Sequence, residues 1–586
     1  MAAVPTSLLA AGWSFDATGG PELSAAVRSF LSALSSPPQV LGLGEPTHGE
    51  PAFPQLRNRI FEVLVDHGFR SIAVESDRVA ALDVDAFVRG ERGTLESAMD
   101  TGFSHGFGRL DANRDLVAWM RAYNDSRPAA ERLAFYGFDP PLEMTGAPSP
   151  RRYLQHLHGY LAQHLGSDGF LHGREDLQGL LGEDERWTDP AVIMTAEKSV
   201  GASPEAVALR AVADDLLTAL YAHAPRLVAA SSPADWRRAE LHGKTTLGLL
   251  RYHAQMADVA PPAERTSRLL AVRDALMAQN LLDIRGHEQH RGATLVFAHN
   301  RHLQRHPSTW RLADMDLEWF SAGSILSTVL DDRYAVVVGS LGASAALGLD
   351  APAGHTFEGA LAEAAHGCAL FDAVRLRHAL GGHAGTVRPR TDITAEQGYF
   401  PLDAATLEHC EAVLHIGSGS EGNPFAPTPA ELADRILALP DVAHVQADEG
   451  SGAPESSWGD RFFFVGPDRR QPFATIVEHD TPGFDEDSHL DRPGVFRLSM
   501  ELGREEFERQ FGYRPAEFPS RHSAMDFTRL DEIFPHPVYG TRGWACILNP
   551  SPRCLPDVDR LLACGHRLAR DRRQRALDRH RAGPTP

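Results

Sequence analysis

The stretch at residues 40–75, VLGLGEPTHGEPAFPQLRNRIFEVLVDHGFRSIAVE, predicts a strand, a polar loop, a helix and a second strand. The first strand ends in glycines and is followed at once by Glu45 and His48, and the second strand ends on Glu75. In a right-handed βαβ unit both strand ends emerge on the same edge of the sheet, where α/β proteins present their chemistry. We therefore expect Glu45, His48 and Glu75 to converge.

Helix and strand patterns continue to alternate beyond this unit. Further strands are predicted at residues 132–139, 293–297, 334–338 and 412–416. Between residues 150 and 280 the chain is rich in alanine and leucine at helical spacing, without clear strands. These patterns predict an α/β domain, with a mainly parallel sheet flanked by helices and a large helical insertion.

A composition break precedes a second domain. Residues 417–429, GSGSEGNPFAPTP, are rich in glycine, serine and proline, which is typical of a linker. Short strands are then predicted at residues 461–465, 472–477, 494–500 and 543–548, between a short helix and a long closing helix. We assign residues 1–424 to the α/β domain and residues 430–586 to a smaller α+β domain with a mainly antiparallel sheet.

Composition limits the class of protein. The 586 residues are 43% apolar and 23% charged, and the formal net charge is -21. This length supports large cores, and the acidic balance argues against a nucleic-acid partner. The five cysteines form neither a C-x-x-C pair nor an even-numbered disulfide set. No signal peptide or bilayer-spanning apolar run is recognised, so we predict a cytoplasmic protein without a membrane partner.

Several familiar catalytic motifs are excluded. GKT at 243–245 is not a phosphate-binding loop, because Arg238 stands where the first glycine is needed. The letters G-x-G-x-x-G at 417–422 are followed by prolines that interrupt the helix a pyrophosphate would require. There is no G-x-S-x-G elbow, and HEQH at 287–290 lacks the spacing of the H-E-x-x-H zinc motif.

A set of ionisable side chains remains at predicted strand ends or on the helix after the first strand. Its members are Glu45, His48, Arg57, Glu75, His299 and His302. A histidine can take a proton from water, a carboxylate can orient it, and an arginine can stabilise developing negative charge. This set suffices for hydrolysis through activated water without a cofactor. The structural alternative is that Glu45 caps the helix, Arg57 pairs with Glu75, and the histidines are satisfied core groups.

Three residues are predicted to contact the substrate. His105 lies in a glycine-containing loop at residues 102–113, and such loops often form pocket walls. Asn300 and His302 follow the strand at 293–297 and adjoin His299. We expect these residues to line the substrate beside the catalytic set.

Motifs in a fixed order resemble the erythromycin esterase family over roughly the first 420 residues. They are GEPTHG at 44–49, Arg57 within LRNR, AVE at 73–75, FYGFD at 135–139 and AHNRH at 298–302. The resemblance implies an α/β hydrolase without metal, and the family's macrolide-resistance members open a macrolactone ring. It implies His48 as the general base and Glu45 and Glu75 as groups that orient it. It also implies that Arg57, His299 and His302 position the ester carbonyl and stabilise the oxyanion.

The C-terminal domain resembles an uncharacterised domain family. The likeness rests on motifs such as WGD at 458–460, LDRPGVFRL at 490–498 and HPVY at 536–539. It brings no activity with it. We expect a binding or regulatory role for this domain rather than a second catalytic site.

Three hypotheses for function follow from these patterns. The first is hydrolysis of a small-molecule carboxylic ester or macrolactone by histidine-activated water. The second is a non-catalytic protein that captures a small molecule in the same cleft. The third is a metal-dependent hydrolase that uses His299, His302 and His306, which share a helical face.

Overall fold

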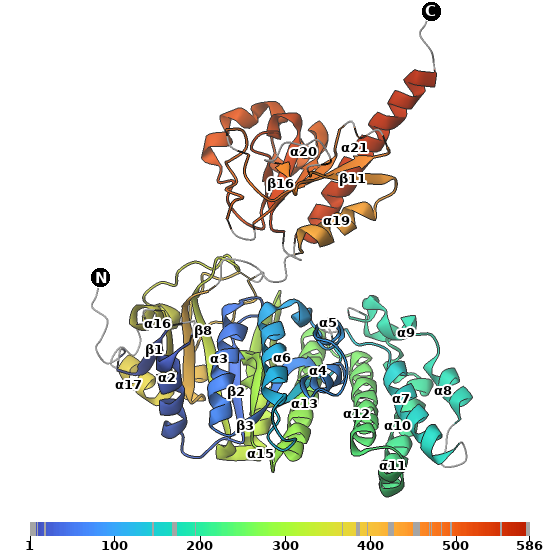
Figure 1. Ribbon diagram of the computed structural model, residues 1–586, viewed down its shortest axis with the longest axis vertical. Coiled ribbons are helices and arrows are strands. Elements are labelled where there is room, and N and C mark those ends of the chain that lie inside the picture. The colour runs from blue at the N-terminus through green and yellow to red at the C-terminus, as the bar shows by residue number, and fades with distance from the viewer. Residues whose placement is uncertain are drawn as a thin grey trace, which may run out of the picture. The chain divides into compact units, whose positions relative to one another are not determined.

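The structure is a computed structural model that divides into two compact units, residues 1–421 and 422–586, each with its own core (Figure 1). It describes residues 8–581 except 9, 17–18, 143–145, 167–172, 194, 366, 382–386, 395–396, 420–426, 449, 451–456, 468, 470, 482, 493–494 and 551–553. Much of the predicted linker, residues 420–426, therefore lies outside the described residues.

The first unit is built on an eight-stranded sheet in the order β1-β9-β10-β8-β2-β5-β3-β4. The parallel strands are β10 (Ala412–Ser418), β8 (Tyr334–Ala343), β2 (Val40–Glu45), β5 (Ala293–His299), β3 (Phe69–Asp77) and β4 (Ala134–Asp139). Strand β9 (Cys368–Asp372) runs antiparallel to β10, and β1 (Gly12–Phe15) pairs antiparallel with β9 at the edge of the sheet. The predicted mainly parallel α/β sheet is confirmed, and its strands β9 and β1 were not indicated by the sequence.

Helices cover both faces of this sheet (Figure 1). One face packs against α2 (Pro21–Ala33), α3 (Ala52–Asp66), α4 (Ala81–Val88) and α6 (Asp111–Asn124), and the other against α13 (Pro262–Glu288), α15 (Ala322–Leu330), α16 (Phe357–Ala365) and α17 (Ala373–Gly381). Along β5, Leu295 and Phe297 enter the first core, whereas Val296 and Ala298 enter the second. Because both faces are buried, the central strands are almost continuously apolar, and polar groups gather at the strand ends.

The helical insertion has a core of its own. Its main helices are α7 (Arg151–Leu165), α10 (Pro204–Ala222) and α12 (Pro233–Met256). Leu154, Leu209 and Leu216 are fully buried between them. Helix α13 begins inside the predicted insertion but continues past its predicted end at residue 280, and it packs against both α12 and the sheet. This helix therefore connects the insertion to β5.

The second unit contains a six-stranded antiparallel sheet in the order β11-β12-β13-β14-β16-β15. Its strands are β11 (Val442–Gln446), β12 (Arg461–Val465), β13 (Ala474–Val477), β14 (Arg497–Glu501), β15 (Ile533–Pro535) and β16 (Trp544–Leu548), and its helices of nine or more residues are α19 (Pro429–Leu437), α20 (Gly503–Phe511) and α21 (Leu555–Arg581). The predicted α+β class is confirmed. Strands β11 and β15 were not indicated, because β11 has no buried residue and β15 has only three residues.

Helix length alone does not make a membrane segment. Helices α13 and α21 each have 27 residues, but both carry many charged side chains. Within the described ranges, no helix is both long and apolar enough to cross a membrane.

Candidate active site

Three neighbouring strands of the first unit carry predicted site residues at or near their carboxyl ends. Strand β5 lies between β2 and β3, and the register sets Glu45 directly beside His299. The backbone N–H of His299 donates to Glu75 Oε2 at 2.9 Å, which ties the end of β5 to β3. The parallel strands thus bring Glu45, His299 and Glu75 together at their carboxyl ends.

A glycine at the end of β2 makes room for Asn300. The Asn300 side chain accepts from the Gly339 N–H at 3.0 Å and donates to the Gly339 carbonyl at 2.9 Å. A Cβ on Gly44 would lie 2.1 Å from Asn300 Oδ1. The amide of Asn300, a predicted substrate contact, is therefore engaged with the backbone of β8 and joins β5 to that strand.

Gly44→Ala is expected to lower the free energy of unfolding by about 1–3 kcal/mol, since the added methyl overpacks a buried position. The methyl must displace the Asn300 amide and, with it, the ends of β2 and β5. Urea unfolding of the full chain would measure the change. The matched control is Gly286→Ala in α13, where nothing outside the backbone of the helix itself lies within 4 Å of the added Cβ and alanine favours the helix. Equal loss of stability in both variants would contradict the packing argument.

His48 is the half-exposed histidine of the cluster. Its Nδ1 lies 2.7 Å from Glu45 Oε1, and its Nε2 lies 3.8 Å from Glu75 Oε1. Its side chain is 39% exposed, whereas the side chains of Glu45 and Glu75 are at most 8% exposed. Its ring centroid lies 5.4 Å from that of Phe107 and 5.3 Å from that of His299. Burial would lower the pKa of His48, but the negative charges of Glu75 and Glu45 outweigh it and raise the pKa.

The two carboxylates beside His48 differ in their affinity for protons. Burial raises the pKa of Glu45, and the hydrogen bond with His48 only partly offsets it. Burial also acts to raise the pKa of Glu75, but the positive charges of His302, His48 and Arg273 hold that pKa well below its usual value. Glu75 is therefore the fixed negative charge of the cluster.

His299 is buried, and both of its ring nitrogens contact backbone groups. Its Nε2 lies 3.2 Å from the Pro46 carbonyl oxygen, and its Nδ1 accepts from the Arg301 N–H at 3.2 Å. Burial, together with the positive charge of His48, lowers the pKa of His299 well below its usual value. A neutral ring that donates from Nε2 and accepts at Nδ1 satisfies both contacts.

His302 is a buried imidazolium between two carboxylates. Its Nδ1 lies 2.9 Å from Asp274 Oδ1, and its Nε2 lies 3.3 Å from Glu75 Oε1. Burial would lower the pKa of His302, but the charges of Asp274 and Glu75 raise it to about 10. Asp274 also accepts from Trp319 Nε1 and from the Ala322 N–H, both at 2.8 Å. This network holds the ring in one orientation.

Alkaline pH is expected to remove stability that the His302 imidazolium supplies. Its folded-state pKa of about 10 lies above the unfolded value of about 6.5, so its contribution is complete below pH 6.5 and declines until about pH 10. Between these pH values, the free energy of unfolding should fall more steeply in the wild type than in His302→Gln. Urea unfolding at several pH values would measure both slopes, with His67→Gln, an exposed histidine, as the control. Equal slopes for wild type and His302→Gln would contradict the assigned charge.

Arg273 extends the cluster towards His105. Its Nη2 lies 2.5 Å from Asp139 Oδ2 and 3.3 Å from Glu75 Oε1. His105 Nε2 lies 2.9 Å from the same Asp139 oxygen. The ring of Phe107 stands 5.5 Å from that of His105 and 5.4 Å from that of His48. The predicted substrate contact His105 therefore joins the cluster through Asp139 and Phe107.

Three members of this network were not named from the sequence. Asp139 ends a predicted strand, and this position was a sufficient reason to include it among the candidate site residues. Arg273 and Asp274 are adjacent in the middle of α13, where no local pattern distinguishes them from other charged helical residues. Their place in the site depends on the packing of α13 beside β3 and β5.

Arg57 is buried but does not pair with Glu75. Its guanidinium donates to Asn58 Oδ1 through Nε at 3.0 Å and Nη2 at 2.7 Å, and it lies 4.9 Å from the Phe297 ring centroid. Burial lowers the pKa of Arg57 to about 9, against the opposing charge of Glu45. These contacts replace the Arg57–Glu75 ion pair considered as a structural alternative.

The three histidines of the metal hypothesis do not converge. The ring nitrogens of His299 and His302 face the backbone and carboxylate partners given above, and His306 stacks on His409 with centroids 5.7 Å apart. In the part of the chain that the structure describes, no three His, Cys, Asp or Glu residues are arranged to hold a metal ion. The geometry therefore does not favour a metal-dependent hydrolase.

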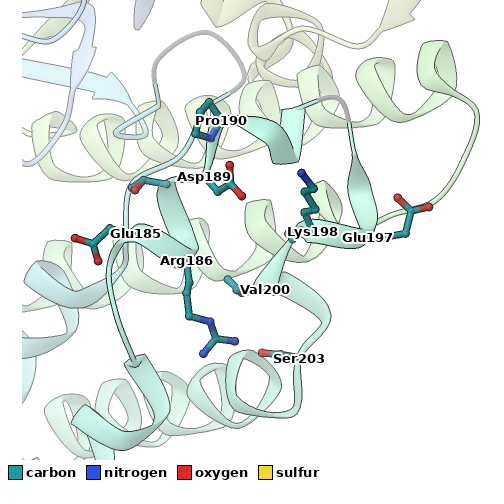
Figure 2. Close-up of a pocket in the computed structure, with 10 residues that line it drawn as sticks. Glu185, Arg186, Asp189, Pro190, Glu197, Lys198, Val200 and Ser203 are labelled. Atoms are coloured by element: carbon teal, nitrogen blue, oxygen red, sulfur yellow. The ribbon is translucent and has the colours of Figure 1, made fainter.

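A hollow of about 750 Å³ lies elsewhere, in the helical insertion. Figure 2 shows acidic and basic side chains around it: Glu185, Asp189 and Glu197, with Arg186 and Lys198. None of the predicted site residues lines this hollow. We place the candidate active site at the His48 cluster, because several ionisable groups with perturbed pKa values meet there.

The fold and the cluster define an α/β protein with its candidate active site at the carboxyl ends of parallel strands. A sequence model of the erythromycin esterase family matches residues 64–417, and the chain belongs to this family. Membership supports a hydrolase with a small-molecule substrate. Glu45, His48 and Arg57 precede the matched range, so their assignment rests on the geometry. A model of a family of unknown function, DUF6194, matches residues 427–578.

Three solved structures are similar to this chain. A crystal structure of a Bacillus cereus protein, 17% identical with a TM-score of 0.52, covers 71% of this chain and 97% of its own, and shows the fold. A succinoglycan biosynthesis protein is 15% identical, with a TM-score of 0.49 and coverage of 71% and 96%. A mutant of the erythromycin esterase EreC in its open conformation is 16% identical, with a TM-score of 0.46 and coverage of 67% and 94%. No curated protein matches the sequence.

Proposed function

We propose that the chain hydrolyses a carboxylic ester or macrolactone with water that His48 activates as general base. One observation carries the proposal: His48 is 39% exposed, while Glu45 binds its Nδ1 at 2.7 Å. His299 and His302 are at most 7% exposed, and both ring nitrogens of each are engaged. Of these three histidines, His48 is thus the one that a substrate can reach from solvent.

The two carboxylates prepare His48 for proton transfer. Glu45 on Nδ1 favours the tautomer whose Nε2 accepts a proton from water. As the water oxygen bonds to the ester carbonyl carbon, that proton moves to Nε2, and the charges of Glu45 and Glu75 stabilise the imidazolium formed. His48 then returns the proton to the leaving alcohol oxygen as the ester C–O bond breaks. The proposed reaction needs no cofactor.

Two buried cations are the proposed groups for the developing oxyanion. The His302 imidazolium lies on the segment after β5, and the Arg57 guanidinium lies on α3. Preorganised positive groups in a water-poor environment stabilise such charge strongly. The neutral His299, fixed by backbone contacts, is proposed to position the carbonyl. We assign this activity to the domain at residues 1–424 and propose none for residues 430–586.

A mass-spectrometric hydrolysis screen over macrolactones and other natural-product esters would test the proposal. A gain of one water mass that depends on wild-type protein, and is lost in His48→Ala, is the expected result. Turnover that persists in His48→Ala would place the base elsewhere. Ligand-dependent thermal stabilisation without turnover of any compound would favour the binding hypothesis instead.

A further inference from the structure

A second cavity lies at the free edge of the main sheet. Its volume is about 280 Å³, and it is walled by β4, α4, the first turns of α12 and the end of α13. Strand β4 is the last strand of the sheet, so one wall is the sheet edge itself. The labels in Figure 1 locate α4, α12 and α13 within the first unit. None of the lining residues belongs to the His48 cluster.

The cavity combines an apolar lining with a cationic one. Leu82, Leu241 and Ile284 supply apolar surface from three different elements. The charged lining consists of five arginines, Arg78, Arg89, Arg92, Arg237 and Arg238, and three carboxylates, Asp85, Glu91 and Asp235. The residues that line the cavity thus include more guanidinium groups than carboxylates.

Most of the lining arginines have a carboxylate partner. Arg78 pairs with Asp283 at 3.3 Å, and Arg89 pairs with Asp85 at 2.6 Å. Arg92 and Arg238 both donate to the same oxygen, Asp83 Oδ1, at 3.1 and 3.0 Å, so one carboxylate serves two guanidinium groups there. Arg237 makes no hydrogen bond or ion pair with any residue that the structure describes, although it lines the cavity.

Two further features make the cavity attractive to an anion. His287 lines it, and partial burial together with the positive charges of Arg237 and Arg89 lowers the pKa of this histidine to about 4. Burial and the nearby positive charges thus both keep the ring neutral. The first residues of the 24-residue helix α12 also line the cavity, so the positive end of the helix dipole adds to that field.

We propose that this cavity binds a small organic anion, with its apolar part against Leu82 and Ile284 and its carboxylate or phosphate group at Arg237 and Arg238. Guanidinium groups bind such oxyanions through paired, charge-assisted hydrogen bonds. The volume is near the lower end of small-molecule sites, which favours a compact ligand over a segment of a macromolecule. This site is separate from the proposed hydrolytic site and does not depend on it.

Isothermal titration calorimetry of the full chain with phenyl phosphate, in chloride-matched buffer, would test the inference. Saturable binding of one ligand per chain is expected, with weaker binding of inorganic phosphate, which lacks the apolar part, and of phenol, which lacks the charge. Arg237→Gln should weaken phenyl phosphate binding at least about tenfold, since a charge-assisted hydrogen bond is lost. Absence of saturable binding to the wild type would overturn the proposal.

Two control variants locate the bound ligand. Arg186→Gln removes an exposed arginine from the hollow in the helical insertion and should leave the affinity unchanged (Figure 2). His48→Ala should also bind phenyl phosphate with wild-type affinity. Loss of binding in His48→Ala would place the ligand at the His48 cluster and overturn the inference, as would equal affinity of Arg237→Gln and the wild type. The melting temperature of each variant in chloride buffer checks its folding.

Discussion

His48→Ala is expected to lower kcat/KM for ester hydrolysis by about 10³-fold, within the range that a general base contributes. The substitution removes the proton acceptor but leaves the network around Glu75, His302 and Asp274 in place. Because the His48 side chain is 39% exposed, its truncation leaves no closed cavity, and the melting temperature should change little. Steady-state kinetics with a substrate from the hydrolysis screen, together with thermal unfolding, would measure both effects.

A matched histidine separates the loss of the base from a general effect of mutation. His67 is an exposed residue at the C-terminal end of α3, in the same βαβ unit as His48. His67→Ala should keep full activity and stability. The proposed mechanism is wrong if His48→Ala retains wild-type kcat/KM, or if His67→Ala loses as much.

Glu75→Gln is expected to have a large effect on both chemistry and stability. The carboxylate faces His48, His302 and Arg273, and its amide replacement leaves two buried cations with one carboxylate partner fewer. Loss of a buried charge partner should cost about 3 kcal/mol of unfolding free energy. Misplacement of His48 should lower kcat/KM by a factor on the order of 10². Urea unfolding and steady-state kinetics would quantify the two losses.

The pH profile distinguishes an electrostatic role of Glu75 from simple misfolding. The charge of Glu75 is the main group that raises the pKa of His48, and only the neutral imidazole acts as base. Activity should therefore rise with pH as His48 loses its proton, which gives the pH–activity profile an ascending limb. Glu75→Gln should move this ascending limb to lower pH. Glu62→Gln, a carboxylate in a surface pair with Arg59, should leave the profile unchanged. An unmoved limb in Glu75→Gln would show that this charge does not tune the base.

Much of the first unit could be predicted because its central strands are buried on both faces. Strands β2, β3 and β5 read as apolar runs that stop at polar residues, and this pattern alone marks a strand end in a parallel sheet. The same pattern indicated Glu45, Glu75 and His299 as candidate site residues. Strand β1 was missed because it is short and only one of its four residues is buried, so its sequence carries little apolar signal.

The partners of the histidines could not be predicted from local patterns. Asp274 and Arg273 are separated from Glu75 by about two hundred positions, and each is an ordinary charged residue in a long helix. Whether such a residue faces the solvent or the site depends on how α13 packs on the sheet. The protonation states of His299 and His302 follow from those partners, so they too were beyond a reading of the sequence.

The stretch at residues 40–75 determined by itself the βαβ unit, its direction and the carboxylates at its strand ends, because apolar periodicity and chain handedness are local properties. Only the tertiary structure decided that β5 lies between β2 and β3, which sets Glu45 beside His299. It also decided that α13 supplies the charges around Glu75 and His302. Strand order and helix packing depend on contacts between distant segments, and such contacts leave no mark in the neighbouring sequence.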